Sequence, residues 1–460
     1  STTAPNHNMI TYSYDDLQAS VIDPMGTITT TDYDVWGRVI KVDEYQLDEQ
    51  SEKIELGPDL TYTYDVLGQL LSVTKGSATT TTIAYDNAGR KTEMDDPDMG
   101  EWSYTYDGAG NLETQTDARG CVTSLEYDAL NRLVQKTYSA TGQCLSNLVP
   151  LPSTIAYSYD SILNNNEGIG RRTGMSDGSG STAWVYDERG RLLQESKTID
   201  TQTFTTSYTY NSADQPVSMT YPDGEIIYYT YASDGQFVSM QRTATPTYVY
   251  VKDVTYDEAG RITEIELGQD GDDAILDRTY SYYDWDDSNG GLLESLETVN
   301  ISESILQNLT YSYDANGNIL NILDSVAGEQ SVFSYDALNR LTSMRVQDSN
   351  YLLYQEFFGY DSDTGRMSGK GPIENNLVPF TYDAGHPHAV SAYNGNQYSY
   401  DDNGNQVERT ITAEGVYHLS YDAENRLVQV TALVEETATP TPVPTQNLTP
   451  TPTVTETPRS

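Results

Sequence analysis

Tyr106-Asp107-Gly108-Ala109-Gly110-Asn111-Leu112 is the stretch that decides the fold, because versions of it recur along nearly the whole chain. The Tyr-Asp pair returns every 21 residues from Tyr64 to Tyr127, and elsewhere the spacing is longer. Other copies begin at Tyr33, Tyr64, Tyr85, Tyr127, Tyr159, Tyr186, Tyr256, Tyr313, Tyr335, Tyr360, Tyr382, Tyr400 and Tyr421, and degenerate ones at Tyr14, Tyr210, Tyr231 and Tyr283. A fixed period of this size predicts stacked repeats rather than a closed domain around one pocket.

Each copy has the pattern of a β-hairpin. The residues before the Asp alternate, as in Leu60-Thr61-Tyr62-Thr63-Tyr64, which places aromatic rings on one face of a strand and hydroxyls on the other. The Asp can bond the backbone two residues on, and the Gly that follows accepts a positive φ. A second turn, such as Asp117-Ala118-Arg119-Gly120, closes the cycle, and the insertion at residues 139–152 falls at such a turn and is expected to be a surface loop. We therefore predict an all-β fold.

Tyr-Asp-x-x-Gly-Arg-Leu at this period resembles the YD repeat of the RHS family, which includes bacterial Rhs and toxin-complex shell proteins and the teneurin ectodomain. The resemblance runs from about Thr11 to Val430. It implies that the hairpins join edge to edge into one long sheet that winds as a spiral shell or β-solenoid around a hollow. We expect this RHS-repeat β-domain over residues 1–434 and a Thr/Pro-rich tail or linker over residues 435–460.

The tail has the composition of an extended stalk rather than of a packed domain. Such stalks in exported proteins are often O-glycosylated, which makes Thr441, Thr449 and Thr451 candidate sites. Sequons at Asn300, Asn308 and Asn447 would accept N-glycans where that machinery exists. A plain spacer is the alternative interpretation.

The net charge of −44, from 69 acidic and 25 basic residues, argues against nucleic acid as a partner. No apolar run reaches the length of a membrane span, so we expect no membrane insertion and no secretory leader within this sequence. Cys121 and Cys144 lie about one repeat apart, and they form either one disulfide of an exported protein or no bridge at all.

The sequence contains few residues that suggest catalysis. His386-Pro387-His388 lacks a third metal ligand and is expected to be a plain turn. The acidic stretches 270–273 and 284–290 lack the full spacing of a calcium loop, and we expect solvated turns there. No nucleophile elbow, phosphate loop or zinc signature is present. We therefore predict a non-enzymatic chain with no catalytic residue, no cofactor and no metal site.

Three functions fit these observations. The first is an extracellular or cell-surface structural protein that self-associates end to end into a tube or filament, because neither end of the repeat array looks capped. The second is the shell fragment of a polymorphic toxin that encapsulates a C-terminal effector. The resemblance places a self-cleaving core and a toxin after the repeats of such relatives, whereas here Leu427 to Val430 lead into the Thr/Pro tail. The third is a carbohydrate- or receptor-binding adhesion protein that uses exposed tyrosines.

Overall fold

The computed structural model describes residues 2–3, 9–76, 79–142, 144, 149–242, 248–268, 274–412 and 414–433. The predicted tail, residues 435–460, lies outside these described residues. The regular structure is nearly all β-strand, which confirms the all-β prediction.

The first half of the strands runs from the N-terminus to the middle of the chain. They are β1 (Thr2–Thr3), β2 (Met9–Asp15), β3 (Gln18–Ile22), β4 (Ile28–Tyr33), β5 (Val39–Leu47), β6 (Lys53–Glu55), β7 (Leu60–Tyr64), β8 (Leu70–Lys75), β9 (Thr79–Tyr85), β10 (Lys91–Asp96), β11 (Gly100–Tyr106), β12 (Leu112–Thr116), β13 (Cys121–Tyr127), β14 (Leu133–Ala140), β15 (Ile155–Tyr159), β16 (Arg172–Asp177), β17 (Gly180–Tyr186), β18 (Leu192–Ile199) and β19 (Gln202–Tyr210), with a short 3-10 helix, η1 (Leu163–Asn165), between β15 and β16.

The second half continues in the same style. Its strands are β20 (Pro216–Thr220), β21 (Ile226–Tyr231), β22 (Phe237–Arg242), β23 (Tyr248–Tyr256), β24 (Ile262–Leu267), β25 (Leu276–Tyr282), β26 (Leu293–Asn300), β27 (Ile305–Tyr313), β28 (Ile319–Asp324), β29 (Glu329–Tyr335), β30 (Leu341–Asp348), β31 (Leu352–Tyr360), β32 (Met367–Gly371), β33 (Val378–Tyr382), β34 (Val390–Tyr393), β35 (Asn396–Tyr400), β36 (Gln406–Ile411), β37 (Gly415–Tyr421) and β38 (Leu427–Leu433).

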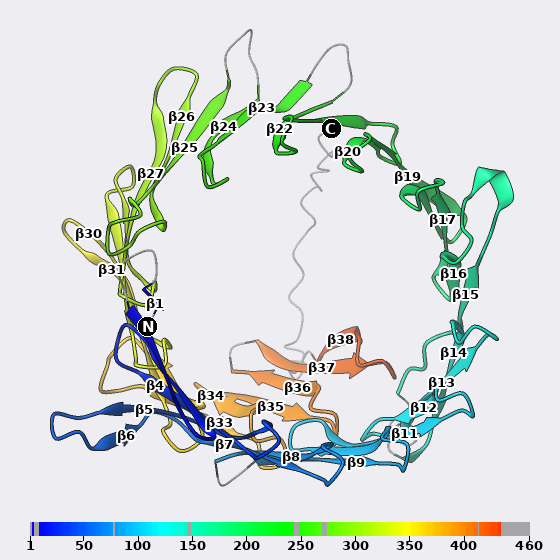
Figure 1. Ribbon diagram of the computed structural model, residues 1–460, viewed down its shortest axis with the longest axis horizontal. Helices are drawn as coiled ribbons and strands as arrows, with labels where there is room; N and C mark the ends of the chain where they lie inside the picture. Colours follow the sequence, from blue (N-terminus) through cyan, green and yellow to red (C-terminus); the bar gives the residue numbers. More distant parts are fainter. Residues whose placement is uncertain are drawn as a thin grey trace, which may run out of the picture.

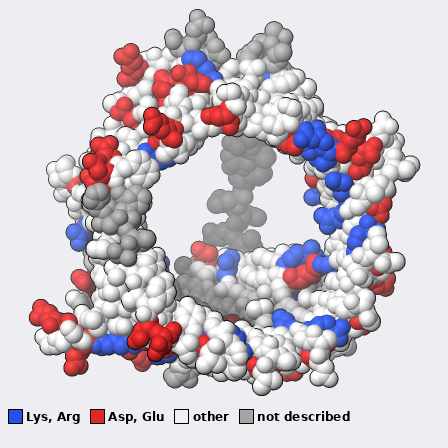
Figure 2. All heavy atoms as spheres, in the orientation of Figure 1, with Lys and Arg blue, Asp and Glu red and all other residues white. Residues whose placement is uncertain are grey.

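These 38 strands form one antiparallel sheet in which strands that follow one another in sequence pair with one another. The exception is β5, which pairs with both β6 and β7, so that β6 forms a short flap with the end of β5. The sheet runs round a ring and continues past one circuit, and β33 to β38 return to the side that holds β7 to β14 (Figure 1). The described residues surround a central opening (Figure 2).

The repeat turn is built by its aspartate. The backbone N–H of Asp107 donates to the carbonyl of Asn111 (2.9 Å), and its Oδ1 accepts from the N–H groups of Ala109 (2.9 Å) and Asn111 (2.8 Å). Gly110 takes a φ of +92°, which a side chain would strain. A hydrogen bond from the side-chain amide of Asn111 (2.8 Å), together with the backbone donors, lowers the pKa of Asp107. The carboxylate therefore stabilises the turn in its ionised form.

The repeat tyrosine packs against the previous hairpin. A β-bulge precedes it, since Thr105 pairs with Thr114 whereas Tyr106 pairs with Leu112. The Tyr106 hydroxyl donates to the carbonyl of Lys91 (2.7 Å), and the guanidinium of Arg90 lies 4.7 Å from the ring centroid. The same hydroxyl-to-backbone bond is made by Tyr64, Tyr159, Tyr186, Tyr210, Tyr231, Tyr256, Tyr282, Tyr313, Tyr335, Tyr360, Tyr382 and Tyr400. Tyrosine thus replaces a thick aliphatic core with a ladder of half-buried rings.

Two degenerate copies differ from the prediction. Tyr282, not Tyr283, occupies the repeat position, because its hydroxyl reaches the carbonyl of Ile262 (2.8 Å) while Tyr283 stands where the Asp would be and donates its N–H to Leu292 (3.0 Å). Two adjacent tyrosines leave this choice open in the sequence. Tyr14 lies in a tight hairpin without a bulge and is 80% exposed.

Candidate functional site

The most constrained region of the described chain is the seam where the second circuit of the sheet meets the first. We call the Tyr-Asp turns the front turns and the second turns of each repeat the back turns. Alternate turns of an antiparallel ladder lie on opposite edges of the sheet. In the seam, front turns after β27 lie against back turns before β15, and the hydrogen bonds across it join residues 282 to 310 positions apart. The seam closes the sheet into a ring.

The seam begins beside the turn after β3. The amide nitrogen of Asn316 donates to Asp23 Oδ2 (2.8 Å), and Thr27 Oγ1 donates to the carbonyl of Ala337 (2.8 Å). Asp23 is held in place because its Oδ1 accepts the N–H groups of Met25 (2.9 Å) and Thr27 (2.7 Å). A back-turn aspartate thus shapes its own turn with one oxygen and binds the incoming front turn with the other.

The middle of the seam depends on glycine. A Cβ on Gly100 would lie 2.7 Å from the carbonyl oxygen of Asp402, and one on Gly404 would lie 2.5 Å from that of Asp98. Both residues also have a positive φ, +67° and +77°, so a side chain is excluded twice. The backbones of the two circuits can approach this closely only because these positions carry no side chain.

The two histidines of the predicted turn bind different carboxylates. His386 Nδ1 lies 3.0 Å from Asp383 Oδ1 in its own turn, whereas the N–H of His388 donates across the seam to Asp98 Oδ1 (2.9 Å). Beside His386 a cavity of about 460 Å³ opens, lined also by the carboxylates of Asp95, Asp96, Glu101 and Asp402. These histidines therefore act as turn and seam residues.

A buried ionic network lies at the far end of the seam. The side chains of Arg119 and Asp117 are each 3% exposed, and the guanidinium donates to Asp117 Oδ2 through Nη2 (2.8 Å) and Nε (3.0 Å). It also donates across the seam to the carbonyl of Asp422 (3.0 Å) and to Asp401 Oδ2 (3.3 Å). The amide of Asn403 completes the contact by donating to Asp117 Oδ2. Arg119 is thus the cation that joins three carboxyl-bearing turns from two circuits.

A disulfide lies directly beside this network. Cys121 and Cys144 are bonded, and with Ala423 of the last front turn they form a buried apolar cluster. Cys144 is fully buried, and the carbonyl of Pro150 accepts the N–H of Ala423 (3.1 Å). The described part of the insertion at residues 139–152 is therefore not a plain surface loop as predicted, because it supports the second circuit.

The last front turn also binds through Glu424. Its Oε1 accepts from the hydroxyl of Tyr138 (2.7 Å) and from Lys136 Nζ (3.0 Å). Burial acts to raise the pKa of Glu424, but these two donors outweigh it and leave the pKa lowered. Burial, together with the hydrogen bond to Glu424, raises the pKa of the Tyr138 hydroxyl.

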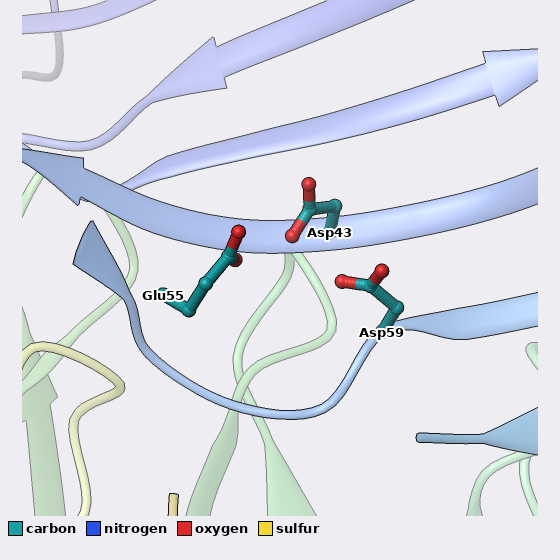
Figure 3. Close-up of side chains that lie close together, drawn as sticks. All are labelled: Asp43, Glu55 and Asp59. Atoms are coloured by element: carbon teal, nitrogen blue, oxygen red, sulfur yellow. The ribbon is translucent and has the colours of Figure 1, made fainter. Parts of the chain in front are cut away.

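Among the described residues, one group of carboxylates has the geometry to hold a cation. Ligand atoms of Asp43, Glu55 and Asp59 lie within 4.8 Å of one another beside the β6 flap (Figure 3). Two ammonium groups already serve this cluster, since Lys53 bonds Asp43 and Glu55 while Lys41 bonds Asp59 (2.8 Å). Burial acts to raise the pKa of Asp43, but its hydrogen bonds and the charges of Lys53 and Lys41, led by the hydrogen bond from Lys53, together outweigh burial and lower the pKa. The lysines are thus the cations of this cluster.

The other predicted site residues lie outside the seam. Asn300 shapes a back turn, because its Oδ1 accepts from the N–H groups of Ser302 and Ser304 (both 3.0 Å). The Asn308 amide nitrogen, which a glycan would occupy, donates to Glu297 Oε2 (2.6 Å) on the neighbouring strand. Asn447, Thr441, Thr449, Thr451 and the acidic stretch 270–273 lie outside the described residues. The stretch 284–290 forms a turn in which Asp287 Oδ1 accepts from Asn289 (2.8 Å).

Sequence reasoning identified the turns of the seam but not their partners. Arg119 is predicted only as part of the turn at residues 117–120, and no local pattern pairs a back turn with a front turn 286 residues away. No helix in the described part of the chain is long and apolar enough to cross a bilayer.

Comparison with known proteins agrees with this geometry. The RHS Repeat family model matches residues 64–98, 106–143, 186–226 and 313–347, which confirms the resemblance noted in the sequence. No curated protein sequence matches the chain. Among solved structures, a Photorhabdus luminescens Tc holotoxin pore shares 17% identity at a TM-score of 0.75, and the match covers 94% of this chain and 24% of that one.

A second solved structure, a TcdB2–TccC3 complex, also shares 17% identity at a TM-score of 0.75, with coverage of 93% and 24%. This chain therefore spans about a quarter of the length of the chains that it matches. At this level of identity the likeness concerns the fold, which is one continuous antiparallel sheet wound into a shell.

Proposed function

Because this chain is built from RHS repeats and its sheet has the fold of the Tc toxin chains, we propose that it is a non-enzymatic shell wall that encloses a polypeptide. The observation that carries the proposal is the seam, in which Arg119, Asp117 and Asn403 join the two circuits of the sheet. A flat or open sheet would need no such contact. A ring closed by buried ion pairs and a disulfide surrounds its central opening with a continuous wall.

The chemistry of the seam supports a structural role rather than a reaction. Its charged groups are paired with one another, as in Arg119 with Asp117 and Asp401, and Glu424 with Lys136. The repeat tyrosines donate their hydroxyls to backbone carbonyls, which favours packing over the adhesion function. The disulfide between Cys121 and Cys144 supports an exported protein, since such bonds persist in oxidising compartments.

The test is protection of an enclosed polypeptide. A protease-sensitive segment fused after Ser460 is compared with the same segment free in solution, and we expect the fused segment to be cut more slowly. Arg119→Met should open the seam and restore cleavage, whereas Arg189→Met, which alters an exposed ion pair with Asp214, should not. Equal cleavage of the fused and free segments would refute enclosure.

A second candidate function is an extracellular filament of rings joined end to end. It is favoured by the strands at the two edges of the described sheet. Among the described residues, β38 pairs with β37 alone, and its residues Leu427, Val428, Val430 and Leu433 are all exposed. In the same described part of the chain, β2 pairs with β1 at Met9 and Ile10 and at no other residue. Unpaired strand edges are templates for association.

A further inference from the structure

Four front turns of the first circuit expose large apolar side chains at their tips. Six large side chains at the tips of these turns are between 71% and 101% exposed: Val35, Trp36, Val66, Leu67, Leu130 and Leu163. We call this set the tip rim. All six follow a Tyr-Asp pair by one to three residues, so they lie along one edge of the sheet. Large apolar side chains concentrated on one edge mark a surface that another surface covers.

The seam shows what covers such a turn. In the second circuit the equivalent tip residues dock on back turns of the first, where Ala423 is 7% and Asn403 is 9% exposed. An apolar tip docks in the same way, since Leu338 Cδ1 lies 3.5 Å from the place of a Cβ on Gly57. Front turns therefore dock on back turns wherever the two edges meet.

In the described part of the chain, several back turns on the opposite edge have no front turn hydrogen-bonded to them. They comprise residues 177–180, 221–224, 300–304, 324–328 and 348–351, and we call them the back rim. This rim also exposes apolar side chains, namely Tyr221 (39%), Ile301 (46%), Val326 (49%) and Tyr351 (72%). A cavity of about 240 Å³ lies at its start, lined by Pro152, Asp177, Ser179 and Arg426, directly beyond the last docked front turn. This cavity is thus the position where a further front turn would dock if the seam continued.

We propose that the tip rim of one copy of this chain docks on the back rim of a second copy, so that the rings stack head to tail as a continuation of the seam. This inference rests on the end-to-end candidate function and names its interface. Both rims belong to this chain, both are apolar, and the contact repeats a turn-on-turn geometry that the chain already makes within itself.

Charge sets the condition for stacking. A net charge of −44 repels a second copy at low ionic strength. Screening shortens the range of that repulsion from about 10 Å at 0.1 M salt to about 3 Å at 1 M. Apolar contact between the rims is not weakened by salt, so stacking strengthens as salt is added.

Sedimentation velocity between about 0.1 M and 1 M salt tests the interface. The wild-type chain should form dimers and longer species as concentration and salt rise. A tip-rim variant (Trp36→Ser, Leu67→Ser, Leu130→Ser) and a back-rim variant (Tyr221→Ser, Val326→Ser, Tyr351→Ser) should each associate on the order of 100-fold more weakly, as truncation of interface anchors does. A control variant, Leu47→Ser with Ile54→Ser, removes two apolar side chains that are 50% and 49% exposed on the β5–β6 flap. This variant should associate like the wild type.

Mixing the two rim variants gives the sharpest result. Each variant keeps one intact rim, so an equal mixture should form dimers that do not grow, while neither variant does so alone. A wild-type chain that stays monomeric at every salt concentration, a control that weakens as much as the rim variants, or a mixture that stays monomeric would each overturn the interface. Electron micrographs of the same samples show whether the ring itself is closed, so that a closed but monomeric ring refutes stacking and leaves the shell proposal standing.

Discussion

Replacing Arg119 by Met should open the seam while leaving the rest of the ring folded. Methionine fills much of the space of the arginine stem but removes the charge that Asp117 and Asp401 share. Removing one partner of a buried ion pair costs about 3–5 kcal/mol, because the other charges stay buried and unpaired. The amide of Asn403 still donates to Asp117, so we expect the lower end of this range, about 3 kcal/mol. That corresponds to a roughly 100-fold rise in the open fraction of the seam.

Hydrogen exchange followed by mass spectrometry measures this opening directly. Peptides that cover β36 and β37 should exchange roughly 100-fold faster in Arg119→Met, while peptides from β17 to β21 should not change. Arg189→Met is the matched control, because Arg189 and Asp214 are 51% and 47% exposed and surface pairs contribute about 0–1 kcal/mol. Equal exchange of β36 and β37 in the two variants would refute the idea that Arg119 holds the circuits together.

Three further predictions concern the repeat, the disulfide and acid. In urea unfolding, Tyr106→Phe should cost about 1 kcal/mol, for the lost bond to Lys91, and Tyr106→Ala about 3 kcal/mol, for the ring as well; a loss below about 0.5 kcal/mol in the Ala variant would mean that the ring faces solvent. Reducing the disulfide between Cys121 and Cys144 should speed hydrogen exchange at the Ala423 amide and lower the free energy of unfolding by about 3 kcal/mol. Unchanged exchange at this amide after complete reduction would contradict the idea that the disulfide supports the second circuit. Hydrogen bonds led by the backbone N–H of Arg90 lower the pKa of Asp86, and those led by Asn111 lower the pKa of Asp107. The stability that these ionised carboxylates contribute is therefore present above the ordinary carboxyl pKa and is lost as the pH falls through the lowered pKa values. The melting temperature should stay constant from pH 7 to about 5 and fall below about pH 4, and a melting temperature that rises at low pH would contradict this.

The hairpin was predictable because its causes are local. Asp107, Gly110 and Tyr106 lie within five residues, and each supplies one requirement of the turn: the acceptor, the positive φ and the buried ring. The alternation before each Asp fixed the strands in the same way. The prediction of Tyr283 as the repeat tyrosine was wrong because the local pattern fits either of two adjacent tyrosines. The register of the sheet, in which Tyr282 pairs with Leu293, decides between them.

The seam was not predictable from local sequence because its position depends on the geometry of every hairpin in one circuit. Its partners are separated by the 282 to 310 residues that one circuit takes, and that number follows from the twist and curvature summed over all the hairpins between them. Insertions such as residues 139–152 change the spacing of the repeats without leaving a mark at the docking turn. Cys121 and Cys144 gave the one visible signal, since two lone cysteines about one repeat apart suggested a bridge, but not that Ala423 packs against it.

The turn-on-turn contact within the chain differs in chemistry from the one that we propose between two copies. Within the chain, the docked tips at Asn316 and Asn403 are small and polar, and glycines such as Gly100 bring the backbones together around buried charge. On the tip rim the equivalent positions carry Trp36 and Leu67, which present apolar area, as Leu338 does at the equivalent position where it docks beside Gly57. Buried ion pairs are screened little by salt, whereas repulsion between whole chains is screened strongly. Salt should therefore leave the closed ring intact while it lowers the barrier to the proposed stacking of one copy on another.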